Sequence, residues 1–215
     1  MSYFEHTDDL IKQYFSTLPE AMRLKFETGN QKIIDQFHSN IFLKEGDSIP
    51  SFELLNYDST LKSSSDYLMH SNLLISFYRG EWCPFCNLEI KQYQAYLEDF
   101  KAHNVEVVAI SPQLPDYQFL FREKHQIDID VLSDVDNHLA ARFGLAYELP
   151  HELNKVYKQS LTLDIARYNQ KGVYSLPIPA TYLINQKGVI TYSFIDANYM
   201  HRAEIQDVLT AVKDL

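Results

Sequence analysis

The sequence predicts an α/β protein built on one central mixed β-sheet with helices on both faces. Short apolar runs of strand length alternate with longer segments whose apolar residues recur at helical spacing. Near the C-terminus, two strand-like runs flank Asn185-Gln186-Lys187-Gly188, a pattern typical of a β-hairpin. A β-α-β unit followed by a hairpin and a final helix combines parallel and antiparallel pairing in one sheet.

The first 43 residues are predicted to form a helical extension. Two apolar stripes with helical spacing lie on either side of Pro19, and Gly29-Asn30 interrupts the second stripe. The stripes comprise Leu10, Ile11, Tyr14, Phe15 and Leu18, then Met22, Phe26, Ile33, Ile34 and Phe37. The turn-forming run 46–50 follows, so the main domain is predicted to span residues 44–215.

The main domain is predicted to alternate strands and helices. The expected strands are 73–78, 105–110, 128–132, 182–184 and 189–194, and the expected helices are 84–102, 116–125, 135–143 and a final one around 205–212. Residues 146–172 have weak periodicity, so we expect an insertion with some helix there.

Composition excludes several functional classes. The net charge of −10 argues against a nucleic-acid surface, which would need a basic patch. No apolar run approaches the roughly 20 residues that span a bilayer. The acidic N-terminus lacks the apolar core of a signal peptide, so we expect a cytoplasmic protein in a reducing compartment.

The two cysteines of the chain lie in the run Trp82-Cys83-Pro84-Phe85-Cys86, between a predicted strand and a predicted helix. Free N–H groups and the positive end of a helix stabilise a thiolate, and such placement lowers a cysteine pKa from about 8.5 to roughly 3.5–7.5. The pattern therefore indicates a redox-active pair. Two buried structural thiols or a metal site are alternatives, but zinc would need further ligands at paired spacing, which the sequence does not offer.

Five motifs in order resemble the peroxiredoxin-like branch of the thioredoxin superfamily, the AhpC/TSA family of alkyl hydroperoxide reductase C and thiol-specific antioxidant proteins. The resemblance covers roughly residues 44–213 and implies a thioredoxin-like fold. The motifs are Gly46-Asp47-x-x-Pro50-x-Phe52-x-Leu54, Phe77-Tyr78-Arg79-Gly80-x-Trp82-Cys83-Pro84-x-Cys86, Ala109-Ile110-Ser111-Pro112, Val131-Leu132-Ser133-Asp134 and Pro179-Ala180-Thr181-Tyr182-Leu183-Ile184.

The sequence departs from this family at the residues that carry the chemistry. The family pattern Pro-x-x-x-Thr-x-x-Cys places its proline on Arg79, its threonine on Cys83 and its peroxidatic cysteine on Cys86. The family's distant arginine falls on Pro179, which resembles the cis-proline beside a thioredoxin disulfide. The buried acid of thioredoxins would fall on Phe77.

The roles of the two cysteines stay open at this stage. Cys83, at the helix entrance, is expected to have the more exposed sulfur and to attack first, with Cys86 resolving; the family pattern implies the reverse order. Arg79 is expected either to stabilise the thiolate or to lie exposed and pair with Glu81. We expect supporting roles for Trp82, Pro84, Thr181 and a cis Pro179.

The resemblance implies a thiol peroxidase that reduces hydrogen peroxide or organic hydroperoxides and is recycled by thioredoxin or another dithiol. A protein disulfide reductase and a non-catalytic redox sensor or binding module are the alternatives. No glycine-rich nucleotide fingerprint occurs, so no cofactor is expected. The N-terminal helices are expected to cover the domain or to contribute to a homodimer.

Overall fold

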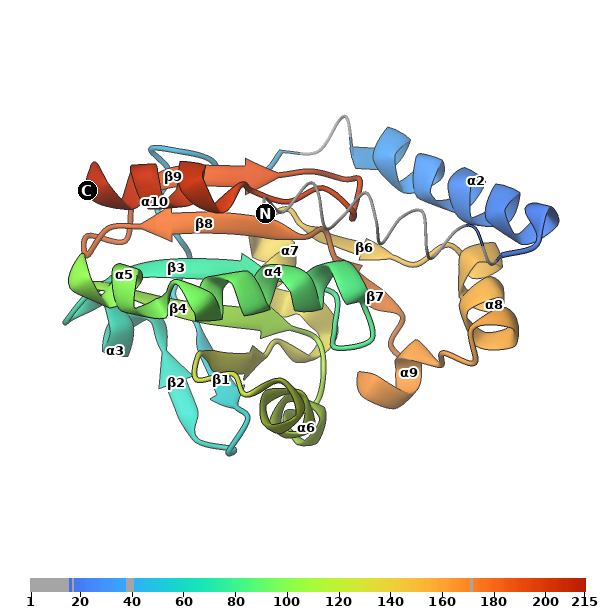
Figure 1. The fold of residues 1–215 in the computed structure, drawn as a ribbon, viewed down its shortest axis with the longest axis horizontal. Coiled ribbons are helices and arrows are strands. Elements are labelled where there is room, and N and C mark those ends of the chain that lie inside the picture. The colour runs from blue at the N-terminus through green and yellow to red at the C-terminus, as the bar shows by residue number, and fades with distance from the viewer. Residues whose placement is uncertain (1–15, 17, 38–40, 171) are drawn as a thin grey trace.

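The computed structural model describes residues 16, 18–37, 41–170 and 172–215 as a central sheet covered by helices (Figure 1). The strands are β1 (Glu53–Asn56), β2 (Leu61–Ser63), β3 (Asn72–Phe77), β4 (Val105–Ser111), β5 (Asp130–Ser133), β6 (Ala146–Glu148), β7 (Ser175–Pro177), β8 (Ala180–Ile184) and β9 (Ile190–Ile195). The helices are α2 (Glu20–Phe37), α3 (Ser64–Leu68), α4 (Pro84–Ala95), α5 (Leu97–Ala102), α6 (Pro115–His125), a 3-10 turn (Val135–Asn137), α7 (His138–Arg142), α8 (His151–Ser160), α9 (Ile165–Tyr168) and α10 (Ile205–Lys213).

Seven strands form the main sheet in the order β2-β1-β5-β4-β3-β8-β9. Strand β3 pairs in parallel with β4 and antiparallel with β8, so the sheet is mixed. The β8–β9 hairpin and α10 complete the layout. The predicted thioredoxin-like α/β fold is thereby confirmed. A second, two-stranded sheet joins β6 to β7.

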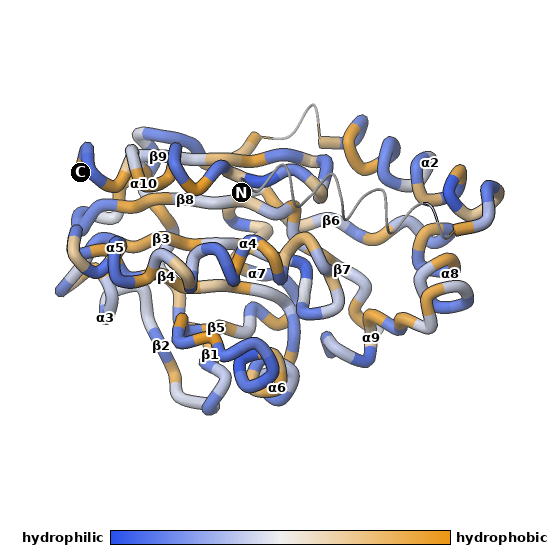
Figure 2. Tube along the Cα trace, in the orientation of Figure 1, coloured by the Kyte–Doolittle hydropathy of each residue, from blue (hydrophilic) through white to orange (hydrophobic). Residues whose placement is uncertain are grey.

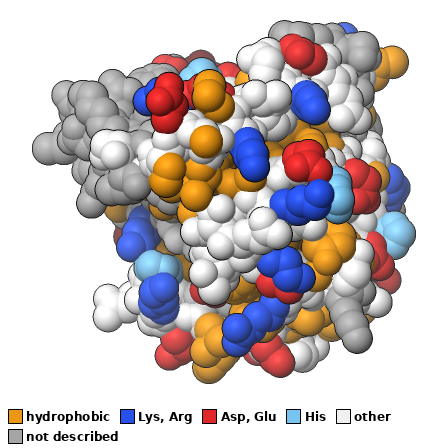
Figure 3. All heavy atoms as spheres, turned by 90° about the vertical axis from the view of Figure 1, so that its right-hand side faces the viewer, with side chains coloured by type: hydrophobic (Ala, Val, Ile, Leu, Met, Phe, Trp, Pro, Cys, Tyr) orange, Lys and Arg blue, Asp and Glu red, His pale blue; other side chains and the backbone are white. Residues whose placement is uncertain are grey.

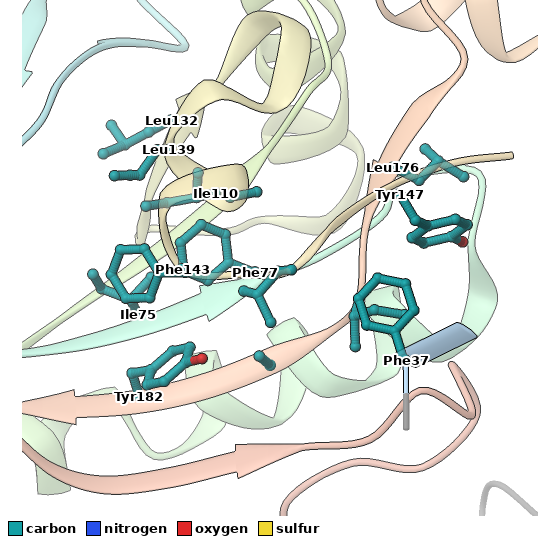
Figure 4. Packing of buried hydrophobic residues seen from close by; sticks show 14 of the residues in the cluster. Phe37, Ile75, Phe77, Ile110, Leu132, Leu139, Phe143, Tyr147, Leu176 and Tyr182 are labelled. Carbon is teal, nitrogen blue, oxygen red and sulfur yellow. The ribbon is translucent and has the colours of Figure 1, made fainter. Parts of the chain in front are cut away.

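The central strands bury residues on both faces of the sheet, as strands covered by helices on each side do. In β3, Leu73, Ile75 and Phe77 belong to one hydrophobic cluster, and Leu74 belongs to the other. The first cluster contains the ring of Phe143, which lies 4.9 Å from the ring of Phe77 (Figure 4). The second cluster, under α4, α5 and α10, contains both cysteines. Hydrophobic stretches accordingly follow the central strands in Figure 2.

The helix predicted over 84–102 is divided at Tyr96 into α4 and α5. Tyr96 has φ −107° and ψ 16°, outside helical geometry, and the chain turns there. The apolar face nevertheless continues, since Ile90, Tyr93 and Phe100 are all buried. The break therefore preserves the burial that the sequence periodicity predicts.

The second N-terminal stripe forms α2, which runs unbroken through Gly29. The first stripe lies outside the described residues except for Leu18. Helix α2 packs on α8 at one end of the molecule (Figure 1). A Cβ on Gly29 would lie 3.1 Å from Leu153 Cβ, so the glycine permits this close approach. Among the described residues, no helix is long and apolar enough to cross a membrane.

The predicted insertion, 146–172, contains β6, α8 and α9. Sequence periodicity did not reveal β1, β2, β6 and β7, which have only three or four residues each. Runs this short do not complete a recognisable alternation. The division into an N-terminal extension, a main domain and an insertion remains a prediction.

Candidate active site

The cysteine motif occupies the loop between β3 and α4. Cys83 is the N-terminal cap of α4, with extended backbone, and Pro84 takes the first helical position, where its missing N–H costs nothing. Cys86 lies one turn further along α4 and is buried. The expected strand-to-helix setting of the pair is therefore what the structure contains.

The loop before Cys83 is held in one conformation. Gly80 has φ +147°, and a Cβ there would lie 2.5 Å from Trp82 Nε1, so only glycine fits. The Glu81 N–H donates to Gln113 Oε1, and Asn87 Nδ2 donates to the Glu81 carbonyl at 2.7 Å. These contacts fix the approach of Trp82 to the site.

Both sulfurs are buried: Cys83 is 1% exposed and Cys86 0%. Exposure therefore hardly separates the two cysteines, because aromatic rings cover the helix entrance, and the expectation that Cys83 has the more exposed sulfur stays a prediction. The two thiols differ instead in access to a small cavity of about 20 Å³, which Cys83 lines and Cys86 does not. The cavity is lined by Phe26, Arg79, Trp82, Cys83, Pro84, Phe85, Tyr157, Leu161, Leu163 and Tyr199.

Arg79 is also buried, at 1% exposure. Its guanidinium stacks between rings, 4.8 Å from the centroid of Trp82 and 4.2 Å from that of Tyr199, and donates to Tyr157 Oη at 2.6 Å. The alternative of an exposed arginine that pairs with Glu81 is wrong. No carboxylate of the described residues forms a salt bridge with Arg79, and its Nε–H has no acceptor there. A buried guanidinium in this situation favours an anion beside it.

A second buried arginine, Arg202, approaches the pair from the other side. It forms an ion pair with Glu89 at 2.7 Å, and its Nη2 lies 3.3 Å from Cys86 Sγ. Glu89 Oε1 also accepts from Thr181 Oγ1 at 3.1 Å and from Tyr93 Oη at 3.2 Å. This network connects α4, β8 and the segment before α10 directly beneath Cys86.

The two cysteines differ in pKa because their surroundings differ. Burial raises the pKa of Cys83, but a hydrogen bond with Cys86 and the positive charges of Arg79 and Arg202 outweigh it and lower the pKa to about 6. Burial raises the pKa of Cys86 well above its ordinary value, and the hydrogen bond and charge of Cys83 raise it further. These shifts favour the thiolate form on Cys83 and the thiol form on Cys86.

Glu89 is the acidic group nearest to this pair in the network. Burial raises its pKa to about 7, although the charge of Arg202 opposes the increase. A carboxyl group with this pKa exchanges its proton near neutral pH, which is the property of a general acid or base.

Pro179 is buried between β7 and β8, next to the Phe77–Ala180 pairing that ends β3. The expectation of a cis peptide bond is wrong, because the described residues contain no cis peptide bond. The chain passes at Pro179 from β7, in the two-stranded sheet, to β8, in the main sheet, through a trans peptide bond. Thr181, expected as a supporting residue, bonds Tyr93 and Glu89 rather than either sulfur.

Sequence reasoning missed Glu89, Arg202, Tyr157 and Tyr199. Glu89 follows Cys86 by three residues, a spacing that places both on one face of a helix and could have revealed it. The other three lie more than 70 positions from the cysteines or the arginine that they contact, and no local pattern marks them. In the part of the chain that the structure describes, no cluster of three or more His, Cys, Asp and Glu residues could hold a metal ion.

Known proteins resemble this chain in sequence and in fold. The sequence model of the AhpC/TSA family matches residues 46–193. A bcp protein of Helicobacter pylori is 26% identical over 170 residues, which cover 79% of this chain and 98% of that protein. Peroxiredoxin Bcp of Escherichia coli is 28% identical over 103 residues, but the match covers 48% of this chain and only 65% of that protein.

Solved structures extend the likeness in fold. Peroxidoxin BcpB from Mycobacterium tuberculosis aligns with a TM-score of 0.63 at 19% identity, over 80% of this chain and 98% of that one. A thiol peroxidase from Chromobacterium violaceum aligns with a TM-score of 0.60 at 16% identity, over 81% and 89% of the two chains. At these identities the likeness is one of fold.

Proposed function

The chain belongs to the AhpC/TSA family of peroxiredoxin-like thiol peroxidases, and on that premise we propose that it reduces a hydroperoxide through the Cys83 thiolate. We assign the attack to Cys83 because its side chain lines the cavity together with Arg79. Cys83 lines the cavity and its pKa is about 6, whereas Cys86 is enclosed and protonated. A thiolate, not a thiol, is the nucleophile in such reactions.

In the first step, Cys83 attacks the terminal oxygen of the hydroperoxide and the O–O bond breaks. The sulfur is oxidised to a sulfenic acid, and the leaving alkoxide or hydroxide takes up a proton to give an alcohol or water. Arg79 lines the same cavity, and its Nε–H is free to donate to a peroxide oxygen. A charge-assisted hydrogen bond of this kind would stabilise the negative charge that develops on the leaving oxygen.

In the second step, Cys86 attacks the sulfenic sulfur of Cys83, which releases water and forms the Cys83–Cys86 disulfide. The two side chains are already hydrogen bonded. Cys86 must lose its proton during this attack. The Glu89 carboxylate, which Arg202 connects to Cys86 Sγ, can take up this proton and return it to the departing hydroxide, which leaves as the water released.

A dithiol is proposed to reduce this disulfide and complete the cycle, with thioredoxin as the reductant that the family implies. Both sulfurs are buried, so the covering rings would have to move before thioredoxin or a protein disulfide substrate could reach the pair. A hydroperoxide is small enough not to need that movement for the oxidising step, which favours the peroxidase over the disulfide reductase.

The test uses reduced wild-type protein and two variants, Cys83→Ser and Cys86→Ser. With hydrogen peroxide, Cys86→Ser should accumulate a sulfenic acid on Cys83 that dimedone captures, whereas Cys83→Ser should not react with dimedone. The wild type should form one intramolecular disulfide within seconds and turn over with thioredoxin. Dimedone capture on Cys86 of Cys83→Ser would reverse the roles. Slow peroxide oxidation together with fast insulin reduction would favour the disulfide reductase instead.

A further inference from the structure

The cavity at Cys83 is lined in part by residues that lie apart from the cysteine motif in the sequence. Phe26 comes from α2, Tyr157 from α8, and Leu161 and Leu163 from the segment that follows α8. Helix α2 precedes residue 46, where the match to the AhpC/TSA family begins. This part of the wall is therefore an addition to the matched family region.

The wall is packed rather than loose. The rings of Phe26 and Tyr157 lie 5.3 Å apart, and those of Trp82 and Tyr157 lie 5.9 Å apart. Tyr157 is further held by the hydrogen bond from Arg79. Gly29 lets α2 approach α8 closely beside this contact. The inner wall thus has little freedom to adapt to a larger molecule.

The size of the cavity limits what can reach the sulfur. Its volume is about 20 Å³, and a cavity needs roughly 10–15 Å³ by this measure to hold one water molecule. Hydrogen peroxide, with two heavy atoms, is close to this limit. A hydroperoxide with a branched alkyl or aryl group has several times as many heavy atoms and does not fit.

Four residues of the wall are only partly buried, Trp82 and Pro84 from the cysteine motif and Leu161 and Leu163 from the segment after α8, so the cavity meets the surface between these two segments. Figure 3 views the end of the molecule that carries α2 and α8, where hydrophobic side chains reach the surface among charged ones. The two leucines are the positions at which the opening can be widened without disturbing the buried rings.

We propose that α2 and the 161–163 segment form a size filter over Cys83, which admits hydrogen peroxide and excludes bulky organic hydroperoxides. This inference rests on the proposed peroxidase function and specifies its substrate class. The chemistry of attack is the same for both substrates, so the discrimination is steric and lies in the wall.

The experiment compares the wild type with the double variant Leu161→Ala/Leu163→Ala, and uses Leu120→Ala as the matched control. Leu120 is an exposed leucine on α6 and does not line the cavity. Second-order rates of Cys83 oxidation are measured with hydrogen peroxide and with cumene hydroperoxide. The double variant should raise the cumene rate relative to the hydrogen peroxide rate by about ten-fold or more, the scale on which apolar pockets discriminate. Leu120→Ala should leave that ratio unchanged.

A second readout does not depend on peroxidase activity. In a Cys86→Ser background, Cys83 is alkylated with iodoacetamide and with the bulkier N-ethylmaleimide. Widening the opening should accelerate the bulkier reagent more than the smaller one. Equal rate ratios in the wild type and the double variant, for alkylation and for peroxides, would overturn the size filter. Failure of hydrogen peroxide to oxidise Cys83, with the alkylation difference intact, would instead overturn the proposed peroxidase function and leave the filter standing.

Discussion

Replacing Arg79 by methionine tests whether its guanidinium is the counter-ion of the Cys83 thiolate. Methionine keeps much of the length and the apolar contacts with the surrounding rings but removes the charge. The pKa of Cys83 is about 6, against an ordinary value of 9.0, a difference equivalent to about 4 kcal/mol in favour of the thiolate. Burial opposes this difference, so the stabilising contacts together supply more than that amount.

Arg79→Met removes one of the two arginines that lower the pKa of Cys83, so the expected rise in this pKa is that caused by losing one nearby positive charge. An opposite charge at close range lowers a pKa by about 1–3. The pKa of Cys83 in Arg79→Met should therefore rise to about 7–9. At pH 7 the thiolate fraction would fall from about 90% to about half or less, and the rate of oxidation should fall in proportion.

The assay is the pH dependence of hydrogen peroxide oxidation, followed by stopped-flow fluorescence. Trp82 is the single tryptophan of the chain and lies beside Cys83, so its emission reports on the site without a label. In the wild type the rate should be nearly constant above about pH 7 and fall to half at about pH 6, because protonation removes the nucleophile. In Arg79→Met the same inflection should move to higher pH.

Two controls separate charge from packing. Arg79→Lys keeps the positive charge and should retain an inflection closer to that of the wild type. Arg122→Met removes another arginine that stacks on a ring, that of Tyr57 at 4.0 Å, but lies on α6 away from the cavity. A correctly folded Arg79→Met protein with its inflection still near pH 6 would refute the counter-ion role.

Three further predictions concern Glu89, Gly80 and Tyr157. Burial raises the folded-state pKa of Glu89 from 4.5 to about 7, so the contribution of its protonated carboxyl to stability is complete below about pH 4.5 and is lost as the pH rises through 7. The stability of Glu89→Gln relative to the wild type, measured by urea unfolding, should therefore increase by about 3 kcal/mol over this interval. A decrease would show that the ion pair with Arg202 dominates. Gly80→Ala should lower the free energy of unfolding by about 1–3 kcal/mol and shift the Trp82 emission, because φ is +147° and the new Cβ would clash with the indole. Unchanged emission and stability would contradict this prediction. Tyr157→Phe should cost about 1–2 kcal/mol in thermal unfolding, because Arg79 Nη2 loses its buried acceptor, and no loss would mean that water replaces the hydroxyl.

Local sequence patterns were sufficient to predict most of the fold. Buried runs such as 105–110 and the 182–194 hairpin have the length and apolar character of strands, so the α/β class and the order of the main elements followed from them. The short strands β1, β2, β6 and β7 were missed because three or four residues carry no period. The break at Tyr96 was also missed, since the apolar stripe continues across it.

The sequence predicted the redox motif of the site but not the burial or the pKa values of its cysteines. The Cys83-Pro84-Phe85-Cys86 run at a strand-to-helix junction identified a redox pair, because that chemistry depends on neighbouring residues and on a helix end. Exposure and acidity depend on such neighbours only in part, since Cys86 and Arg79 lower the pKa of Cys83 but distant residues also contribute. Both properties also depend on groups such as Tyr157 and Arg202, which lie 74 and 116 positions from Cys83 and Cys86.

The sequence by itself therefore determined the fold class, the redox motif and its position at a helix start, since these depend on periodicity and on adjacent residues. Only the tertiary structure decided that both cysteines are buried, that Arg202 lies beside Cys86 and joins Arg79 in lowering the pKa of Cys83, and that α2 contributes Phe26 to the cavity wall. The physical reason is that burial and electrostatic interactions depend on distance in space, and a linear sequence does not contain those distances.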